Sequence, residues 1–193
     1  MFPDALLTQI TEAFKRQKPT SWVVDPTKDL VVSELIGKRK RLKVTKMEDE
    51  VNRAIRQFTP VRWQDLPTAV AEKHIDRQVA CDALSFFNAE ALAYYLPGYM
   101  MGVIKSKEFQ EEYLSSVVFV LTLNKDKRDL ELARWREQRL SLFNAKEIAA
   151  IRDFLLYCQE HFLPPPMYEG FEEYNPFAEP IAQWTQRLKE CQA

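Results

Sequence analysis

The stretch Asp82–Lys105 (DALSFFNAEALAYYLPGYMMGVIK) decides the fold that the sequence predicts. It is the most aromatic and least charged part of the chain, and it contains the conformationally restricted dipeptide Pro97-Gly98. Asn88 is a residue type that caps helices, so we predict a helix that begins at Ala89. Apolar residues then recur at three- and four-residue steps, which predicts one buried face: Leu92, Tyr95, Leu96, Tyr99 and Val103.

Pro97 lies in the middle of this helix and has no N–H to donate to the carbonyl of Ala93, so a kink or a split is expected there. One interpretation is a hinge inside the core, which an apolar stripe at helical spacing favours. The other is the floor of a ligand pocket, because phenolic hydroxyls, a freed carbonyl and a carboxylate can hold polar groups. The candidate binding residues for that pocket are Tyr94, Tyr95, Pro97, Tyr99 and Asp82.

Composition favours a mainly α-helical, compact, bundle-like domain. The 193 residues are 46% hydrophobic and 28% charged with a net charge of −1, which suits one domain with a substantial core. Four glycines against eleven prolines favour helices joined by proline-bounded loops over a β-rich fold. Residues 21–36 contain two short β-branched runs around Asp25-Pro26, and a small β-hairpin and a loop both remain open there.

Periodicity and capping signals predict the other helices. Thr45 and Glu48 have the spacing of a capping box, and Asn144 with Glu147 opens the clearest helix. The helices expected are Pro3 to Lys18, Thr45 to Phe58, one carrying Val70, His74, Ile75 and Val79, a long partly enclosed one through Phe109 and Leu121, a short exposed one within 124–140, Asn144 to Phe162, and Phe177 to Glu190. We expect His74 to be a core or boundary residue.

We predict a helical domain at residues 1–162 and a proline-rich tail at 163–193 that ends in a helix. The aromatic residues of the tail favour wrapping around the domain, and a tail that is disordered until it binds a partner is the alternative. A basic insert occupies residues 37–46 (GKRKRLKVTK). Its candidate polyanion-binding residues are Lys38, Arg39, Lys40, Arg41 and Lys43. Acidic residues follow directly at 48–50, so a solvated surface loop is the favoured interpretation, and nucleic acid is not the expected partner.

Motifs for reaction chemistry are absent from the sequence. It contains no glycine-rich phosphate loop, CxxC, HExxH or GxSxG. We assign no catalytic residue and no cofactor, and we expect no metal site because His74 and His161 are far apart in sequence. Three cysteines without short spacing suit reduced thiols. The first residues do not resemble a signal peptide and no apolar run is long enough to span a bilayer, so a cytoplasmic protein without membrane contact is expected.

Three segments resemble a bacterial domain family of unknown function. They are the F-x(4)-W-x-x-L spacing at Phe58 to Leu66, the YYLPGY segment that ends the run from Leu84 to Tyr99, and FNAKEIAAIRDFL at Phe143 to Leu155. The resemblance covers residues 5 to 162. That family usually has YYLPAY, so Gly98 is a departure that is expected to loosen the kink at Pro97. The resemblance implies a compact helical fold and no established catalytic residues.

The sequence does not specify an activity, and we carry three functional hypotheses. The first is a non-catalytic, cytoplasmic protein-binding or regulatory module, with inhibitor or immunity-type proteins as one version. Its partner would be another protein. The alternative is a small-molecule or enzymatic pocket at the Pro97 kink. The third is polyanion binding through Lys38–Lys46.

Overall fold

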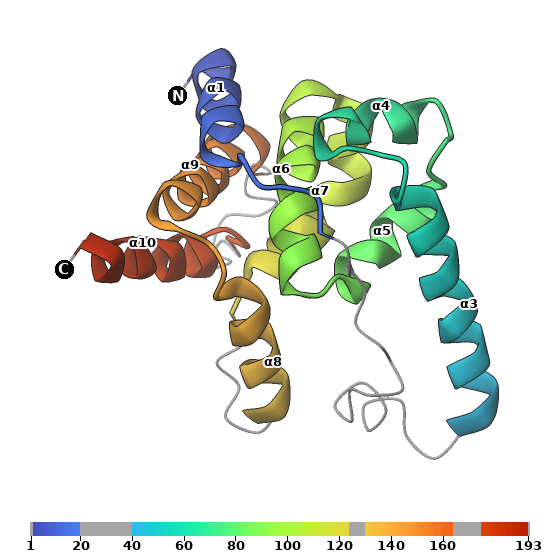
Figure 1. Ribbon diagram of the computed structural model, residues 1–193. Helices are drawn as coiled ribbons and strands as arrows, with labels where there is room; N and C mark the ends of the chain where they lie inside the picture. Colours follow the sequence, from blue (N-terminus) through green and yellow to red (C-terminus); the bar gives the residue numbers. More distant parts are fainter. Residues whose placement is uncertain (1, 20–39, 124–129, 164–174, 193) are drawn as a thin grey trace, which may run out of the picture.

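Helix α6 (Ala89–Lys105) runs through the centre of the molecule in the computed structural model of the chain (Figure 1). The structure describes residues 2–19, 40–123, 130–163 and 175–192. These residues form nine α-helices and one 3₁₀ helix, with no strand among them. The prediction of a mainly α-helical domain is therefore confirmed. The hairpin proposed for residues 21–36 lies outside the described residues.

Two groups of helices lie on either side of α6 and its neighbour α7 (Figure 1). The buried apolar side chains from both groups join in one continuous core. One group comprises α1 (Pro3–Ala13), α9 (Ala145–Phe162) and α10 (Ala178–Gln192). The other comprises α3 (Lys40–Phe58), α4 (Leu66–Ala71) and α5 (Arg77–Phe86). The two remaining helices are α7 (Lys107–Leu121) and α8 (Leu130–Leu140). α1 contacts both α6 and α9 and so connects the central helix to the first group.

The two caps at the ends of α6 set its length. The Asn88 side chain accepts a hydrogen bond from the Ala91 N–H at 2.9 Å, which confirms the predicted cap. At the other end, the Ser106 hydroxyl accepts from the Phe109 N–H at 3.2 Å and starts α7. Every residue from 91 to 100 is buried. The predicted apolar face is confirmed, because none of its five residues is more than 1% exposed.

α6 continues through Pro97 without a break, so the split that the sequence allowed is wrong. Neighbouring elements enclose both halves of the helix and hold them in line. A short 3₁₀ helix (Trp63–Asp65) and α4 pack against α6. A Cβ atom added at Gly98 would lie 2.4 Å from the Trp63 carbonyl oxygen and 3.0 Å from the Leu66 Cβ. Gly98 therefore allows a backbone-to-backbone approach that a larger residue would prevent.

The structure corrects the start of α3. The described part of this helix begins at Lys40, so the helix start predicted at Thr45 is wrong, and Thr45 lies inside the helix. Lysine and arginine are good helix formers, and the described part of the basic insert, from Lys40 to Lys46, is helical where a loop was expected. α3 ends at Phe58 as predicted, and Phe58 is fully buried.

A turn at residues 72–76 divides what the periodicity predicted as one helix into α4 and α5. Lys73 adopts a positive φ of 62°, and the Asp76 carboxylate caps α5 by accepting from the Gln78 and Val79 N–H groups at 2.9 and 3.2 Å. The turn sends Ile75 into the core and leaves the His74 side chain 69% exposed. The expectation of a core or boundary position for His74 is therefore wrong.

α1 ends at Ala13, five residues before the predicted end at Lys18. Residues 14–19 are not helical, and two basic side chains among them, Arg16 and Lys18, reach partners on other elements. The Arg16 guanidinium forms a two-pronged ion pair with Glu147, with both N–O distances at 2.6 Å. Lys18 donates hydrogen bonds to backbone carbonyls at the end of α3, among them Val61 at 2.8 Å. This segment fastens α1 to α9 and to α3.

The capping box predicted for α9 is confirmed. Asn144 accepts from the N–H groups of Lys146 and Glu147, and the Glu147 carboxylate accepts from the Asn144 N–H at 2.9 Å. The Glu147 side chain is 1% exposed, so Arg16 compensates a buried charge. The final predicted helix is also present as α10, which packs along α9.

Substituting Gly98 by alanine tests the close approach of Trp63 to α6. Helix propensity alone predicts that the alanine variant is more stable. The clash with the Trp63 carbonyl predicts the opposite sign, a loss of about 1–3 kcal/mol in the free energy of unfolding. Urea denaturation followed by circular dichroism measures the difference. Equal or greater stability of Gly98→Ala would show that the 3₁₀ helix moves away freely.

Substituting Arg16 by methionine leaves the Glu147 carboxylate buried without its cation. We expect a loss of about 3–5 kcal/mol in the free energy of unfolding. Lys15→Met is the matched control: Lys15 is the next residue, and its ion pair with Glu12 is exposed, so its removal is expected to cost at most about 1 kcal/mol. Similar losses in both variants would contradict the role assigned to Arg16.

Candidate functional site

The tyrosines of the proposed kink pocket are buried and bonded to the protein's own backbone. Tyr95 donates to the carbonyls of Phe58 at 2.9 Å and Val61 at 3.1 Å, and Tyr99 donates to the Ala80 carbonyl at 2.6 Å. Both side chains are fully buried. Burial raises the pKa of both hydroxyls above the ordinary value for tyrosine, so they stay protonated donors.

The other residues proposed for that pocket also have structural partners. Tyr94 is 5% exposed, and its hydroxyl, whose pKa is raised by burial, hydrogen bonds with the Trp63 backbone. Pro97 lies inside the buried helix. Asp82 lies in the interior of α5 and accepts a hydrogen bond from the Gln78 side chain at 2.9 Å. A ligand pocket at the kink stays a prediction, and none of these residues lines the two cavities described below.

The residues of the basic insert fall partly outside the described chain. Lys38 and Arg39 lie outside the described residues. Lys40, Arg41 and Lys43 lie in the first turns of α3, where the helical backbone alone is described. Polyanion binding through this insert therefore stays a prediction as well.

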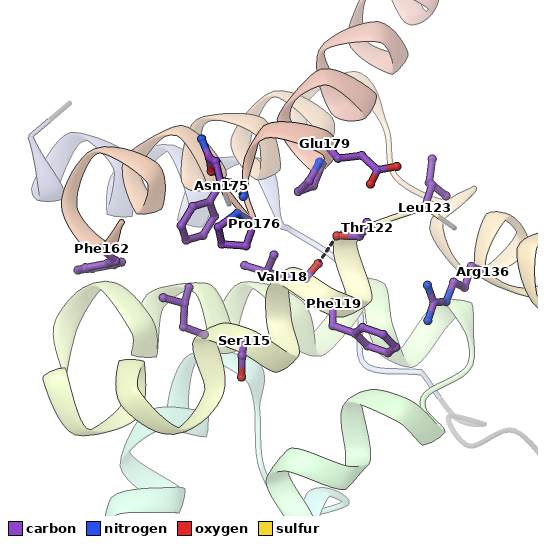
Figure 2. Close-up of a pocket in the computed structure, with 13 residues that line it drawn as sticks. Ser115, Val118, Phe119, Thr122, Leu123, Arg136, Phe162, Asn175, Pro176 and Glu179 are labelled. Atoms are coloured by element: carbon purple, nitrogen blue, oxygen red, sulfur yellow. Dashed lines mark hydrogen bonds between the residues drawn. The ribbon is translucent and has the colours of Figure 1, made fainter. Parts of the chain in front are cut away.

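A groove of about 590 Å³ lies between α7 and the segment that leads into α10. Figure 2 shows α7 below the groove, the residues from Asn175 to Glu179 above it, Phe162 at one end and Arg136 at the other. Val118, Pro176 and Phe177 give it a mainly apolar lining. From Leu114 to its end at Leu121, α7 extends along the groove for about 10 Å, at 1.5 Å per helical residue.

An exposed aromatic ring forms one wall of this groove. The Phe119 side chain is 59% exposed, whereas the other phenylalanine of α7, Phe109, is 5% exposed. The Arg136 guanidinium carbon lies 4.4 Å from the centre of the Phe119 ring, which is a cation–π contact (Figure 2). The contact positions a large apolar surface beside an open groove. Such a combination of aromatic and arginine side chains is enriched at protein interfaces.

The polar groups of the groove suit binding better than reaction chemistry. Ser115 and Asn175 are neutral, and Arg136 and Glu179 bring opposite charges to its edge. The Thr122 hydroxyl donates back to the Val118 carbonyl at 2.8 Å, as the dashed line in Figure 2 shows. Among the described residues there is no group of three or more histidine, cysteine, aspartate or glutamate side chains arranged for a metal ion. No described helix has both the length and the apolar character needed to cross a membrane.

Hydrogen bonds join α10 to the end of α7 beside the groove. The Trp184 indole donates to the Leu121 carbonyl at 2.8 Å, and the Gln183 side chain bonds to both the N–H and the carbonyl of Leu123. Trp184 is fully buried, and its ring packs edge-on against Phe143 at a centroid distance of 5.7 Å. α10 is therefore joined to the end of α7 by three hydrogen bonds and by core packing.

Comparison with known proteins identifies the family. Residues 4–162 match the model of a family of unknown function, DUF6714. The chain belongs to this family. The match agrees with the resemblance over residues 5 to 162 that the sequence motifs indicated. No curated protein and no solved structure matches the chain.

Some residues that line the groove lie inside the family match and others lie beyond it. α7, Arg136 and Phe162 lie within the part of the chain that matches DUF6714, whereas Asn175 to Pro180 lie beyond it. The sequence motifs did not identify this site. The buried face of α7 carries an apolar residue at every fourth position: Phe109, Tyr113, Val117 and Leu121. Phe119 does not belong to this series. That offset was the one available signal that Phe119 points away from the core.

Substituting Trp184 by alanine tests whether the residues beyond the family match stabilise the family fold. The change removes a buried ring and its hydrogen bond to Leu121, and we expect a loss of about 3–5 kcal/mol in the free energy of unfolding. Chemical denaturation measures it. Gln186→Ala on the same helix, whose side chain bonds only to Glu190 on the surface, is the control. A small effect of Trp184→Ala would show that the DUF6714 region is stable without α10.

Proposed function

We propose that this chain is a non-catalytic binding module and that a segment of another protein docks in the groove between α7 and α10. The observation that carries the proposal is Phe119, an aromatic side chain left 59% exposed at the edge of an apolar groove and braced by Arg136. Soluble proteins seldom leave such surfaces uncovered without a binding role.

The lining of the groove supports a partner of defined chemistry. Val118 on one side and Pro176 and Phe177 on the other offer apolar contact, and Arg136 and Glu179 add opposite charges to the lining. A segment that inserts two or three apolar side chains and keeps its own charges at its ends fits this arrangement. A length of about 10 Å corresponds to roughly two turns of a docked helix.

The thiols support a cytoplasmic setting for this module. Cys81, Cys158 and Cys191 are all free, and Cys158 is buried in the core. Burial raises the pKa of the Cys158 thiol well above its ordinary value, so it stays protonated and unreactive. Free buried thiols are typical of reducing compartments.

A two-stage binding experiment tests the proposal. A photo-crosslinking amino acid in place of Phe119 first identifies the protein that contacts the groove. The purified partner is then titrated against the wild-type chain, Phe119→Asp and Leu156→Asp. Leu156 is 42% exposed on α9 and does not line the groove, so it is the matched control. We expect Phe119→Asp to weaken binding about 30-fold or more, as at an interface hot spot, and Leu156→Asp to leave it unchanged.

Two results would overturn the proposal. One is a partner that binds Phe119→Asp as tightly as the wild-type chain, with circular dichroism showing that both are folded. The other is a small molecule that saturates the groove and is excluded by Ser115→Trp, while no protein contacts position 119. The groove would then be a ligand pocket.

A further inference from the structure

Arg139 is a buried cation on a helix that the sequence predicted to be exposed. It lies in α8 and is 6% exposed, so the expectation of an exposed helix is wrong at this residue. A second cavity, of about 300 Å³, lies where α8 meets the start of α6. Arg139 lines this cavity together with Asn88, Ala89, Glu90, Trp135, Gln138 and Leu142.

The positive charge of Arg139 is only partly compensated by its neighbours. Its Nη2 donates to the Leu84 carbonyl at 2.5 Å, in the last turn of α5, and its guanidinium lies 4.3 Å from the centre of the Trp135 ring. Its Nε is buried and has no hydrogen-bond partner. No carboxylate of the described residues forms an ion pair with it. Burial, with a smaller contribution from Arg136, lowers the pKa of Arg139 to about 10.

A buried arginine without a carboxylate is costly, because the charge loses its hydration and gains little in return. The hydrogen bond to Leu84 places a cation at the C-terminal end of α5, where the helix dipole favours positive charge. That contact uses one of the five N–H groups of the guanidinium. The remaining donors leave the capacity to bind a further acceptor.

The start of α6 adds positive potential to the same cavity. α6 is 17 residues long, and its dipole and first N–H groups attract anions. Asn88 satisfies the N–H groups of Ala91 and Leu92. Within the described part of the chain, the N–H groups of Ala89 and Glu90 have no hydrogen-bond acceptor. Ala89, Glu90 and Arg139 therefore all line one small cavity.

We propose that this cavity binds a small organic anion, with its carboxylate or phosphate group held between Arg139 and the first N–H groups of α6. Trp135 and Leu142, which is 41% exposed, supply an apolar surface for the rest of the ligand. A cavity of this size holds a small molecule. The site shares no lining residue with the α7–α10 groove and does not depend on the proposed function.

Glu90 allows anion binding in the cavity to be distinguished from a purely structural role for Arg139. Among the described residues it is the one carboxylate that lines the cavity, and it is exposed. Its negative charge opposes a bound anion without compensating Arg139. Neutralising Glu90 therefore strengthens anion binding if the cavity is the site, and changes nothing if Arg139 serves only to cap α5.

Amide-resolved NMR titrations test the proposal on the full chain. The probes are benzoate and phenyl phosphate, with benzyl alcohol as the uncharged control and chloride added to keep the ionic strength constant. We expect saturable shifts of the Ala89 and Glu90 amide signals and of the Arg139 Nε–H signal with the anions only. The anion that binds with the higher affinity shows whether the site prefers a carboxylate or a phosphate ester.

Three variants connect the binding to the residues. Arg139→Gln is expected to weaken binding about tenfold or more, the effect of losing a charge-assisted hydrogen bond. Arg134→Gln changes the net charge equally on an exposed position of α8 and is expected to leave affinity unchanged. Glu90→Gln is expected to tighten binding about threefold or more, as removal of a nearby like charge at partial exposure predicts.

The proposal is overturned if the shifts rise linearly with anion concentration, or if Arg134→Gln weakens binding as much as Arg139→Gln. Should Arg139→Gln fail to fold, Glu90→Gln decides alone, because Glu90 is exposed and its substitution preserves the fold. Unchanged affinity in Glu90→Gln would then reject the site.

Discussion

The complete burial of the middle of α6 is the constraint on which the rest of the structure depends. A buried hydroxyl must find a partner inside the protein, because leaving it without one costs about 1–3 kcal/mol. The Tyr95 hydroxyl donates to backbone carbonyls at and just after the end of α3, and the Tyr99 hydroxyl donates to a backbone carbonyl of α5. The tyrosines therefore fix the positions of two neighbouring helices as well as filling the core. Their environment makes them part of the framework.

Much of the framework could be predicted because its signals are local. Asn88, Asn144 and the three- and four-residue spacing of apolar side chains act within one or two helical turns, and the structure has these caps and faces. The segment after α1 instead contacts distant residues, because Arg16 pairs with Glu147, which is 131 residues away. No local pattern contains that pairing, and helical spacing alone predicts a longer helix than the structure has.

The cavities could not be predicted for a related reason. Arg139 belongs to a charged stretch that is typical of a solvated helix, and its burial results from packing against α5 and α6. The groove depends on Asn175 to Pro180, which meet α7 only in the folded chain. Arg136 and Arg139 are three residues apart on α8, so one helix brings a cation to each of two separate cavities.

Trp184 lies beyond the residues that match the family, yet it donates a hydrogen bond to Leu121 inside them. The stretch that defines the family stops at residue 162, yet an indole from outside it covers the end of α7 and the ring of Phe143. A relative truncated at that boundary would expose this hydrophobic seam to water. It would need a substitute cover, such as another copy of itself, to keep this seam out of water.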